Sequence, residues 1–442
     1  MRKRNLFPVI LVCLIILIIG GAGFIFFKDM QGPEISTIPD TGRVSPSTTL
    51  KITMKDPAGI RSLVVGIRKN NVLNVIFNKH YDTYEPEVTA EVPLKNAQLR
   101  EGAFELDIRA TDGSLAGFGQ GNTKTMLLPM RLDTRSPRIT MQALPPNVRR
   151  GGAGVIRYLI DEDVTQTGVL IGDYFVPGYL QKDGSYVCFF PFPYTMTAKE
   201  FKNAIKITAT DLAGNVTRHP LTLMAYERNF KKDKLEISDN FLQTVEAKLS
   251  HLAPHAKSPL ECYLYINKEV RAANVEMLRN LRDDTSAAIL WNGAFLRLPR
   301  SAARAGFADH RTFTYNGQTV GESWHLGFDL ASIRNAPVPA SNSGKIILTG
   351  EEGIYGNIIV IDHGLGLMSI YSHLNEILVK PGDIVQKGQQ IGITGSTGLA
   401  FGDHLHFGIL VGGLEVTPLE WIDPKWIKDN VTSRIGEDLF PH

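Results

Sequence analysis

The chain has 442 residues, of which 43% are hydrophobic and 21% are charged. This balance excludes a largely disordered chain, and the length predicts more than one globular domain. The formal net charge is only +2, which is too close to neutral for a nucleic-acid-binding protein. We therefore expect no nucleic-acid partner.

The N-terminus carries the pattern of a membrane anchor. Three basic residues, Arg2–Arg4, precede an uncharged apolar run from Leu6 to Phe27. As a helix this run would span about 33 Å, enough to cross a hydrocarbon core of about 30 Å. The positive-inside rule places the basic tip in the cytoplasm and the rest of the chain outside. We predict an uncleaved tip and transmembrane helix over residues 1–30, with a cleaved signal peptide as the alternative because Gly20–Gly23 are small.

Residues 33–228 contain two copies of one β unit. Each copy has alternating strands and ends on a strand followed by Ala-Thr-Asp and a glycine turn, at Leu106–Gly113 and at Ile205–Asn215. Units of about 100 residues with short, turn-punctuated strands resemble bacterial Ig-like β-sandwich domains. We place these modules at 33–135 and 136–228 and expect them to offer surfaces for protein partners.

Residues 229–300 are predicted to be a linker with helices. Ser238 is a suitable N-cap for a helix with an apolar face, formed by Phe241, Leu242, Val245 and Leu249. A second helical stripe has one polar interruption and consists of Val270, Asn274, Met277, Leu278 and Leu281. We interpret both stripes as ordinary packing faces.

The C-terminal part is rich in glycine and β-branched residues and predicts strands and tight turns. We predict an antiparallel β domain over residues 301–428 and a tail over residues 429–442. The predicted fold class is therefore mainly β, with two Ig-like modules, a helical connector and this C-terminal domain after one transmembrane helix.

Three short segments of this domain concentrate the chemically informative histidines. His325 and Asp329 are four residues apart, and on one strand they would face the same side. His404 and His406 would likewise share a face, and His373 ends an apolar strand between the two segments. The apolar residues of the first segment would then point into a core: Leu326, Phe328 and Leu330.

Imidazoles combined with a carboxylate match a catalytic zinc site, in which three protein ligands leave one position open. Zinc lowers the pKa of a bound water to about 7, and the reaction then needs a base and a group that stabilises the oxyanion. Four histidines and one aspartate would supply three ligands and two helpers. Spacing alone does not say which residue has which role.

Together these segments resemble the lysostaphin-type, or LytM-like, zinc peptidases of the bacterial cell wall. The matching segments are Phe307–Arg311, His325–Asp329, Ala336–Ala340, Gly344–Ile346, Tyr355–Asn357, Asp362–Gly366, Tyr371–Leu374, Val379–Gln389, Gly392–Gly398, His404–Phe407 and Val416–Pro418. The resemblance implies that Zn²⁺ is bound by His325, Asp329 and His406. It also implies that His373 and His404 flank the metal-bound water, as base and as stabiliser of the tetrahedral intermediate. Asn357 would orient the substrate.

The resemblance implies a zinc-dependent endopeptidase that hydrolyses peptide bonds in peptidoglycan stem or cross-link peptides. Such an enzyme would be held in the cytoplasmic (inner) membrane by its N-terminal helix, with its catalytic domain in the periplasm. Linkages from D-alanine to a diamino acid are then the expected targets, rather than glycine bridges.

Three alternatives stay open from the sequence. The first is a non-catalytic peptidoglycan-binding regulator of other cell-wall hydrolases. The second is a latent enzyme whose cleft is covered by residues 229–300. The third is a lipoyl or biotinyl carrier, because Val379–Gln389 resembles the hairpin of such carriers; it is disfavoured because the usual lysine-bearing tip is absent.

Overall fold

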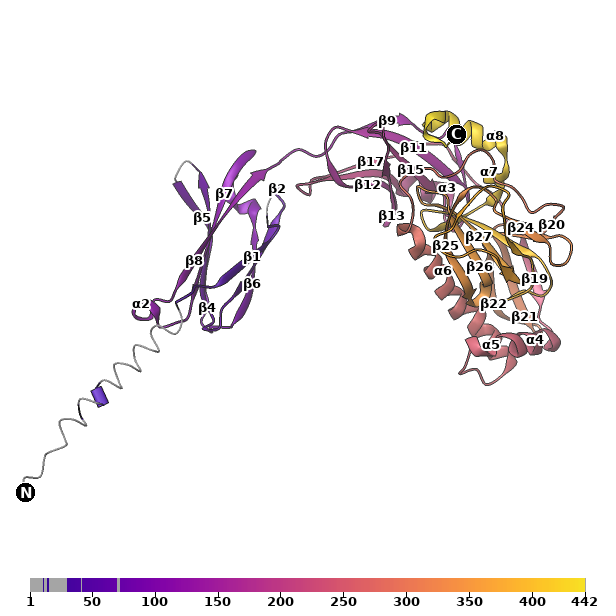
Figure 1. Cartoon of the computed structure of the whole chain (residues 1–442), viewed down its shortest axis with the longest axis horizontal. Helices are drawn as coiled ribbons and strands as arrows, with labels where there is room; N and C mark the ends of the chain where they lie inside the picture. The colour runs from indigo at the N-terminus through magenta and orange to yellow at the C-terminus, as the bar shows by residue number, and fades with distance from the viewer. Residues whose placement is uncertain (1–10, 12–13, 16–29, 41, 70–71, 442) are drawn as a thin grey trace, which may run out of the picture. The chain divides into compact units, whose positions relative to one another are not determined.

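The computed structural model describes the chain except for residues 1–10, 12–13, 16–29, 41, 70–71 and 442 (Figure 1). The described part consists mainly of strands in antiparallel sheets, which confirms the predicted class of a mainly β protein. Most of the predicted anchor lies outside the described residues. Among the helices of the described residues, none is long and apolar enough to span a membrane.

The chain forms two compact units. The first comprises residues up to Pro137 with Asp163–Thr165 and Thr210–Val216, and the second comprises the remaining residues up to the C-terminus. The domain boundaries and the Ig-like character of the two N-terminal modules remain predictions.

The first unit is a sandwich of two sheets with strand orders β1-β3-β6 and β2-β8-β7-β4-β5. Alternating residues such as Leu50, Ile52 and Met54 of β3 are fully buried between the sheets, as period-two patterning requires. The elements are β1 (Glu34–Ile38), β2 (Gly42–Val44), β3 (Thr49–Lys55), β4 (Ile60–Lys69), β5 (Val72–His80), β6 (Glu87–Pro93), β7 (Gly102–Asp112), α2 (Ala116–Gly119) and β8 (Thr123–Leu132).

Residues 138–226 form two four-stranded sheets, β14-β15-β11-β9 and β13-β12-β16-β17, and a short parallel pair, β10-β18. Phe190, Phe192 and Phe201 stack in the core between the four-stranded sheets. The elements are β9 (Ile139–Ala143), β10 (Val148–Arg149), β11 (Ala153–Ile160), β12 (Val164–Ile171), β13 (Tyr174–Pro177), β14 (Tyr179–Leu180), β15 (Tyr186–Pro191), α3 (Ala198–Ala204), β16 (Ile205–Asp211), β17 (Val216–Pro220) and β18 (Ala225–Tyr226).

An eight-stranded sheet forms the centre of the C-terminal region, in the order β20-β23-β31-β27-β26-β25-β29 with β32 paired to β31. Every residue of its two central strands, β27 and β31, is buried, including the polar residues Ser369, Ser372 and His373 of β27. The sheet contains β20 (Ala302–Ala305), β23 (Phe328–Ala331), β25 (Gly344–Glu352), β26 (Gly356–Asp362), β27 (Leu367–Leu374), β29 (Ile384–Val385), β31 (Leu405–Val411) and β32 (Leu414–Val416).

Two smaller sheets flank it, β19-β21-β22 and β24-β30-β28. Their strands are β19 (Lys232–Glu236), β21 (Asp309–Tyr315), β22 (Gln318–His325), β24 (Pro337–Pro339), β28 (Glu376–Ile377) and β30 (Gln390–Ile393). The short C-terminal helices are α7 (Pro418–Ile422), α8 (Pro424–Ile427) and α9 (Ser433–Ile435).

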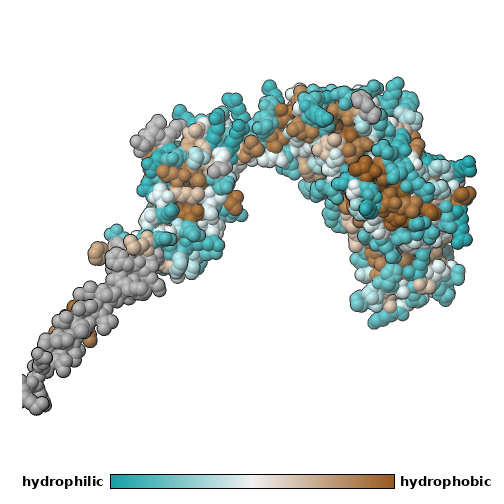
Figure 2. Space-filling view, in the orientation of Figure 1, coloured by the Kyte–Doolittle hydropathy of each residue, from teal (hydrophilic) through white to brown (hydrophobic). Residues whose placement is uncertain are grey.

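The C-terminal sheet shares a core with part of the preceding region. Val155 of β11 and Phe189 of β15 belong to the same buried cluster as Trp421 of α7 and Ile409 of β31. The Ala153 amide also donates to the Glu420 carboxylate, at 2.9 Å. Hydrophilic residues cover most of the visible surface of this second unit, with hydrophobic residues between them (Figure 2).

The helical connector packs against the same sheet from another side. Its helices are α4 (Asp239–Leu249), α5 (Pro259–Tyr265) and α6 (Arg271–Asn280), and a π-helical turn joins the last two. The first predicted helix is confirmed, because Ser238 Oγ accepts from the Phe241 amide and the predicted face is buried. The polar interruption, Asn274, is buried, and its Oδ1 accepts from the Ile354 amide at 2.9 Å. The connector therefore shares a buried apolar core with the large sheet.

One buried acid gives this region a testable pH dependence. Glu415 of β32 is 5% exposed, and its Oε1 has no hydrogen-bond partner among the described residues. Burial raises the pKa of Glu415 to about 7 from the ordinary 4.5, although its own backbone and Arg279 oppose the shift. Between these values the folded state holds a proton that the unfolded state has lost, so stability falls as the pH rises.

We therefore predict that Glu415→Gln flattens the pH dependence of stability between about pH 4.5 and 7. The wild-type protein should lose up to about 3 kcal/mol across this range from this group, at ~1.4 kcal/mol per pKa unit. Thermal unfolding of both proteins at pH 5 and pH 7.5 measures the effect. Equal shifts of the midpoint in the two proteins would show that Glu415 does not titrate in this range.

Candidate metal centre

Strand pairing brings the predicted residues together from three segments of the sequence. In the β23–β31 pair Asp329 lies opposite His406, and in the β27–β31 pair Ser372 lies opposite His406. His373 directly follows Ser372 near the end of β27, so it lies one residue beyond the position that pairs with His406. His404 precedes β31 and forms an isolated bridge with Gly395.

The prediction that His325 and Asp329 share one strand is wrong. His325 ends β22 of the small sheet, whereas Asp329 lies in β23 of the large sheet, and the chain turns between them at Leu326 and Gly327. A Cβ atom at Gly327 would lie 2.6 Å from His406 Nε2, so only glycine lets the backbone pass this ring. Phe328 and Leu330 are buried in the core as predicted, and Leu326 is partly buried against the same core and also lines the cleft.

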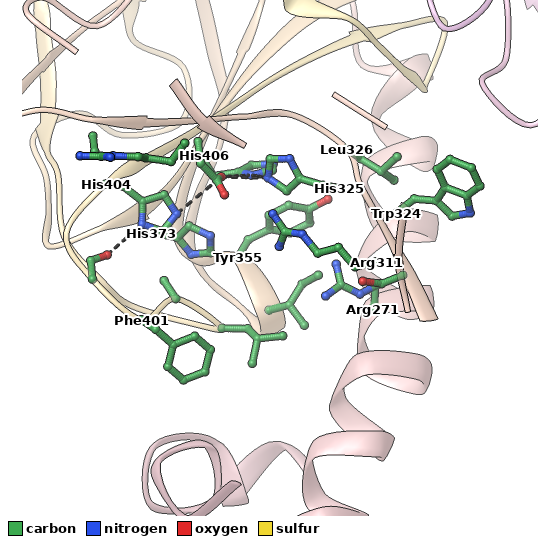
Figure 3. A pocket seen from close by; sticks show the side chains of 18 of the residues that line it. Arg271, Arg311, Trp324, His325, Leu326, Tyr355, His373, Phe401, His404 and His406 are labelled. Atoms are coloured by element: carbon green, nitrogen blue, oxygen red, sulfur yellow. Dashed lines mark hydrogen bonds and ion pairs between the residues drawn. The ribbon is translucent and has the colours of Figure 1, made fainter. Parts of the chain in front are cut away.

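Three donor atoms converge in this centre (Figure 3). His325 Nε2 lies 2.9 Å from Asp329 Oδ1 and 3.1 Å from His406 Nδ1, and His406 Nδ1 lies 3.1 Å from Asp329 Oδ1. A tetrahedral ion with metal–ligand lengths of about 2.0–2.1 Å keeps its ligand atoms about 3.3 Å apart. The donor types and their spacing therefore fit a zinc ion.

The surrounding backbone orients the first of these ligands. His325 Nδ1 lies 2.8 Å from the Gly306 carbonyl oxygen, which only accepts hydrogen bonds. The ring therefore carries its proton on Nδ1 and turns the lone pair of Nε2 toward Asp329 and His406. Metal-binding histidines are commonly held in this way by an outer partner.

The two predicted helpers stand beside this triad. His373 Nδ1 donates to the Thr397 carbonyl at 2.9 Å, which leaves its Nε2 as a free acceptor. His404 Nδ1 donates to the Gly402 carbonyl at 2.8 Å, and its Nε2 lies 3.5 Å from Asp329 Oδ1. The ring centres of His373 and His404 are 4.9 Å apart.

His373 has an unusual backbone conformation. Its φ angle is +63°, in the left-handed region that residues other than glycine rarely adopt. Such strain costs about 1–3 kcal/mol and concentrates at functional positions. The position of this buried imidazole is thus maintained at an energetic cost.

Burial and mutual charge set the protonation of the cluster. Burial lowers the pKa of His406 to about 4, with Asp329 opposing and His325 adding to the effect. Burial and the neighbouring histidines also hold the pKa of His373 well below its usual value. Burial would raise the pKa of Asp329, but its close contacts with His325, His404 and His406 outweigh burial and lower it. Neutral imidazoles beside an ionised carboxylate are the protonation states that a metal requires of its ligands.

His404 differs in direction from the other two histidines. Burial alone would lower its pKa, but the hydrogen bond and the charge of Asp329 outweigh burial and raise it. His404 therefore holds a proton more readily than His373 does. This difference suits one ring to donating a hydrogen bond and the other to accepting a proton.

All five residues line one cleft, but Asn357 is not among the lining residues. The Asn357 side chain instead donates to the Leu374 carbonyl at 3.0 Å, next to His373. Its substrate-orienting role remains a prediction. The cleft also has lining residues to which sequence reasoning assigned no role: Arg271, Val275, Arg304, Arg311, Trp324, Tyr355 and Phe401. Arg311 and Tyr355 lie in recognised motif segments, whereas no pattern distinguishes Arg271 from other helix-surface residues.

Comparison with known proteins identifies the region around this centre. Residues 323–418 match the family described as Peptidase family M23. The chain is 34% identical over 161 residues to peptidoglycan DD-endopeptidase ShyB of Vibrio cholerae. This match covers 33% of this chain and 36% of that protein. It is 41% identical over 96 residues to peptidoglycan DD-endopeptidase ShyA of the same species, which covers 22% of each. The matches thus span well under two thirds of these relatives.

Among solved structures, the catalytic domain of lysostaphin from Staphylococcus simulans is 31% identical to the matched part. The structural match covers 28% of this chain and 94% of the lysostaphin domain, with a TM-score of 0.24. The resemblance predicted from the histidine motifs is thus confirmed by the family match over the segment that holds all five residues. This chain carries a domain of peptidase family M23.

Proposed function

We propose that the protein is a zinc-dependent endopeptidase that hydrolyses peptide bonds in peptidoglycan stem or cross-link peptides. The observation that carries this proposal is the convergence of His325 Nε2, Asp329 Oδ1 and His406 Nδ1, about 3 Å apart, in a cleft that also presents two further histidines. The family match and the names of the relatives support the substrate class.

His325, Asp329 and His406 would hold the metal. When bound, zinc would supply a Lewis acid for the substrate carbonyl and lower the pKa of water to about 7. His373 Nε2, with its lone pair toward the cleft, is placed to accept the proton of the attacking water. His404 Nε2 is placed to donate a hydrogen bond to the carbonyl oxygen as negative charge develops there.

The proposal includes the setting of the enzyme. The N-terminal apolar run would anchor the chain in the cytoplasmic membrane, with the peptidase domain on the periplasmic side, and the two N-terminal modules would bind protein partners. This setting is supported by the basic residues Arg2–Arg4, by the length of the uncharged run Leu6–Phe27 and by the expected substrate.

The function is tested by metal content and digestion of purified sacculi. The full chain, purified in detergent, should bind one zinc ion per molecule by elemental analysis and release muropeptides from sacculi. Treatment with a chelator should stop release, and added zinc should restore it. Zinc-loaded protein that binds sacculi without releasing muropeptides would instead establish a non-catalytic regulator. The masses of the released fragments identify the bond that is cut.

A further inference from the structure

Two arginine side chains form part of the cleft wall beside the metal centre. Arg271 begins α6 of the helical connector, and Arg311 lies in β21. Both line the cleft that contains His325 and Asp329, and Figure 3 places both side chains on the side of Tyr355 that faces the helix. Both arginines precede the segment that matches the peptidase family, residues 323–418.

Neither guanidinium has an anionic partner among the residues that the structure describes. Among the ion pairs of the described residues, none includes Arg271 or Arg311. The two carboxylates that line the cleft are already engaged: Asp329 contacts three histidines, and Asp403 accepts from Thr394 Oγ1 at 2.6 Å and from the Asn335 amide at 2.9 Å. In the described part of the chain, no ion pair therefore neutralises the charge of these two arginines.

Arg271 is held in place by a neutral group. Its Nε and Nη2 atoms donate to the Asn267 amide oxygen at 3.3 and 3.0 Å, one turn earlier on the same helical segment. Burial lowers the pKa of Arg271, and the positive charge of Arg311 adds to this effect. An arginine nevertheless stays protonated in proteins, so two like charges are kept close together and partly buried.

Such an arrangement is unfavourable unless an anion completes it, because partly buried charges need a partner of opposite sign. A guanidinium presents a planar fork of N–H donors that matches a carboxylate. The bonds to Asn267 use one edge of the Arg271 fork and leave Nη1 for a ligand. Arg311 makes no side-chain hydrogen bond to another described residue that would occupy its fork.

We propose that Arg271 and Arg311 together form a subsite for a free carboxylate of the peptide substrate, on the side of the cleft lined by α6. This proposal rests on the proposed function and narrows it to stem peptides with an ionised carboxyl group near the scissile bond. The two arginines act as specificity-determining residues, since they bind the substrate away from the reacting carbonyl.

The test compares two forms of one substrate. A cross-linked muropeptide dimer is prepared with free carboxylates and, by chemical amidation, with neutral amides in their place. The full chain, Arg271→Gln and Arg311→Gln are assayed on both forms for kcat and KM. Arg334→Gln serves as the matched control, because Arg334 is exposed and lies outside the cleft lining.

The wild-type enzyme should prefer the dimer with free carboxylates over the amidated dimer by about 10–100-fold in kcat/KM. This is the typical contribution of charge-assisted hydrogen bonds. This preference should fall to near one in Arg271→Gln and Arg311→Gln, mainly through KM, and should persist in Arg334→Gln. Equal cleavage of both dimers by the wild-type enzyme, or an unchanged preference in both cleft variants, overturns the subsite. Zinc content and thermal midpoints identify any variant that fails to fold. If one of the two cleft variants fails to fold, the substrate preference of the other variant tests the subsite.

A binding measurement separates this proposal from the proposed function. Calorimetric titration of the zinc-free full chain with the two dimers requires no turnover. Tighter binding of the free dimer, lost in Arg271→Gln, supports the subsite even if zinc-loaded protein digests no sacculi. Equal binding of both dimers overturns the subsite, whereas displacement of the dimer with free carboxylates by inorganic phosphate would show a general anion site and overturn a substrate-specific role.

Discussion

Replacing His406 by alanine is expected to abolish both zinc binding and peptidoglycan hydrolysis. His406 Nδ1 is 3.1 Å from both His325 Nε2 and Asp329 Oδ1, so its loss leaves only two of the three proposed ligands. Zinc affinity should fall by more than the roughly 10–100-fold that follows loss of an outer partner of a ligand. Elemental analysis after dialysis and sacculus digestion measure the two effects.

The control for this variant is His251→Ala, which removes an exposed histidine outside the cleft. It should keep wild-type zinc content and activity. If His406→Ala retained stoichiometric zinc, the proposed ligand set would be wrong, whatever its activity. If it lost zinc but still released muropeptides, the metal would not be needed for the reaction.

Replacing His373 by alanine should separate metal binding from turnover. His373 lies outside the set of three converging donor atoms, and its Nε2 is free to accept a proton. We expect full zinc content and a loss of kcat of about 10²–10⁴-fold, the usual contribution of a general base. Zinc analysis and initial rates on a muropeptide dimer check both parts. Wild-type turnover in this variant would assign the base to another residue.

A second substitution at this position tests the backbone strain. Both His373→Ala and His373→Gly lose the imidazole and its bond to the Thr397 carbonyl. Only glycine adopts a φ of +63° without steric cost, so the glycine variant should be about 1 kcal/mol more stable than the alanine variant. Both variants should be inactive because both lack the imidazole. Equal thermal midpoints of the two variants would indicate that the backbone strain at this position is relieved by other means.

The chemistry of the candidate site could be predicted from the sequence because it resides in short local patterns. His404 and His406 alternate with Leu405 and Phe407, and this period-two pattern places both imidazoles on one face whatever the rest of the fold does. The capped helix from Asp239 to Leu249 was predictable for the same reason, since capping and an apolar stripe are local properties.

Other features depended on contacts between distant segments, which local patterns do not encode. Four-residue spacing suggested one strand for His325 and Asp329, yet the two residues lie in different sheets because Gly327 lets the chain turn closely past His406. Spacing also left the roles of the five residues open, and the pairing of β23 and β27 with β31 decided which atoms meet.

In the helical connector, too, local patterns predicted the helices, whereas long-range contacts decided where they pack. Its amphipathic pattern predicted two packing faces, but not the surface on which they pack. Burial of Asn274 against the Ile354 amide and entry of Arg271 into the cleft follow from docking of α6 on the peptidase sheet. The sequence by itself therefore determined the kind of chemistry and the residues able to perform it. Only the tertiary structure decided which donors converge and which charges line the cleft, because both are set by long-range packing.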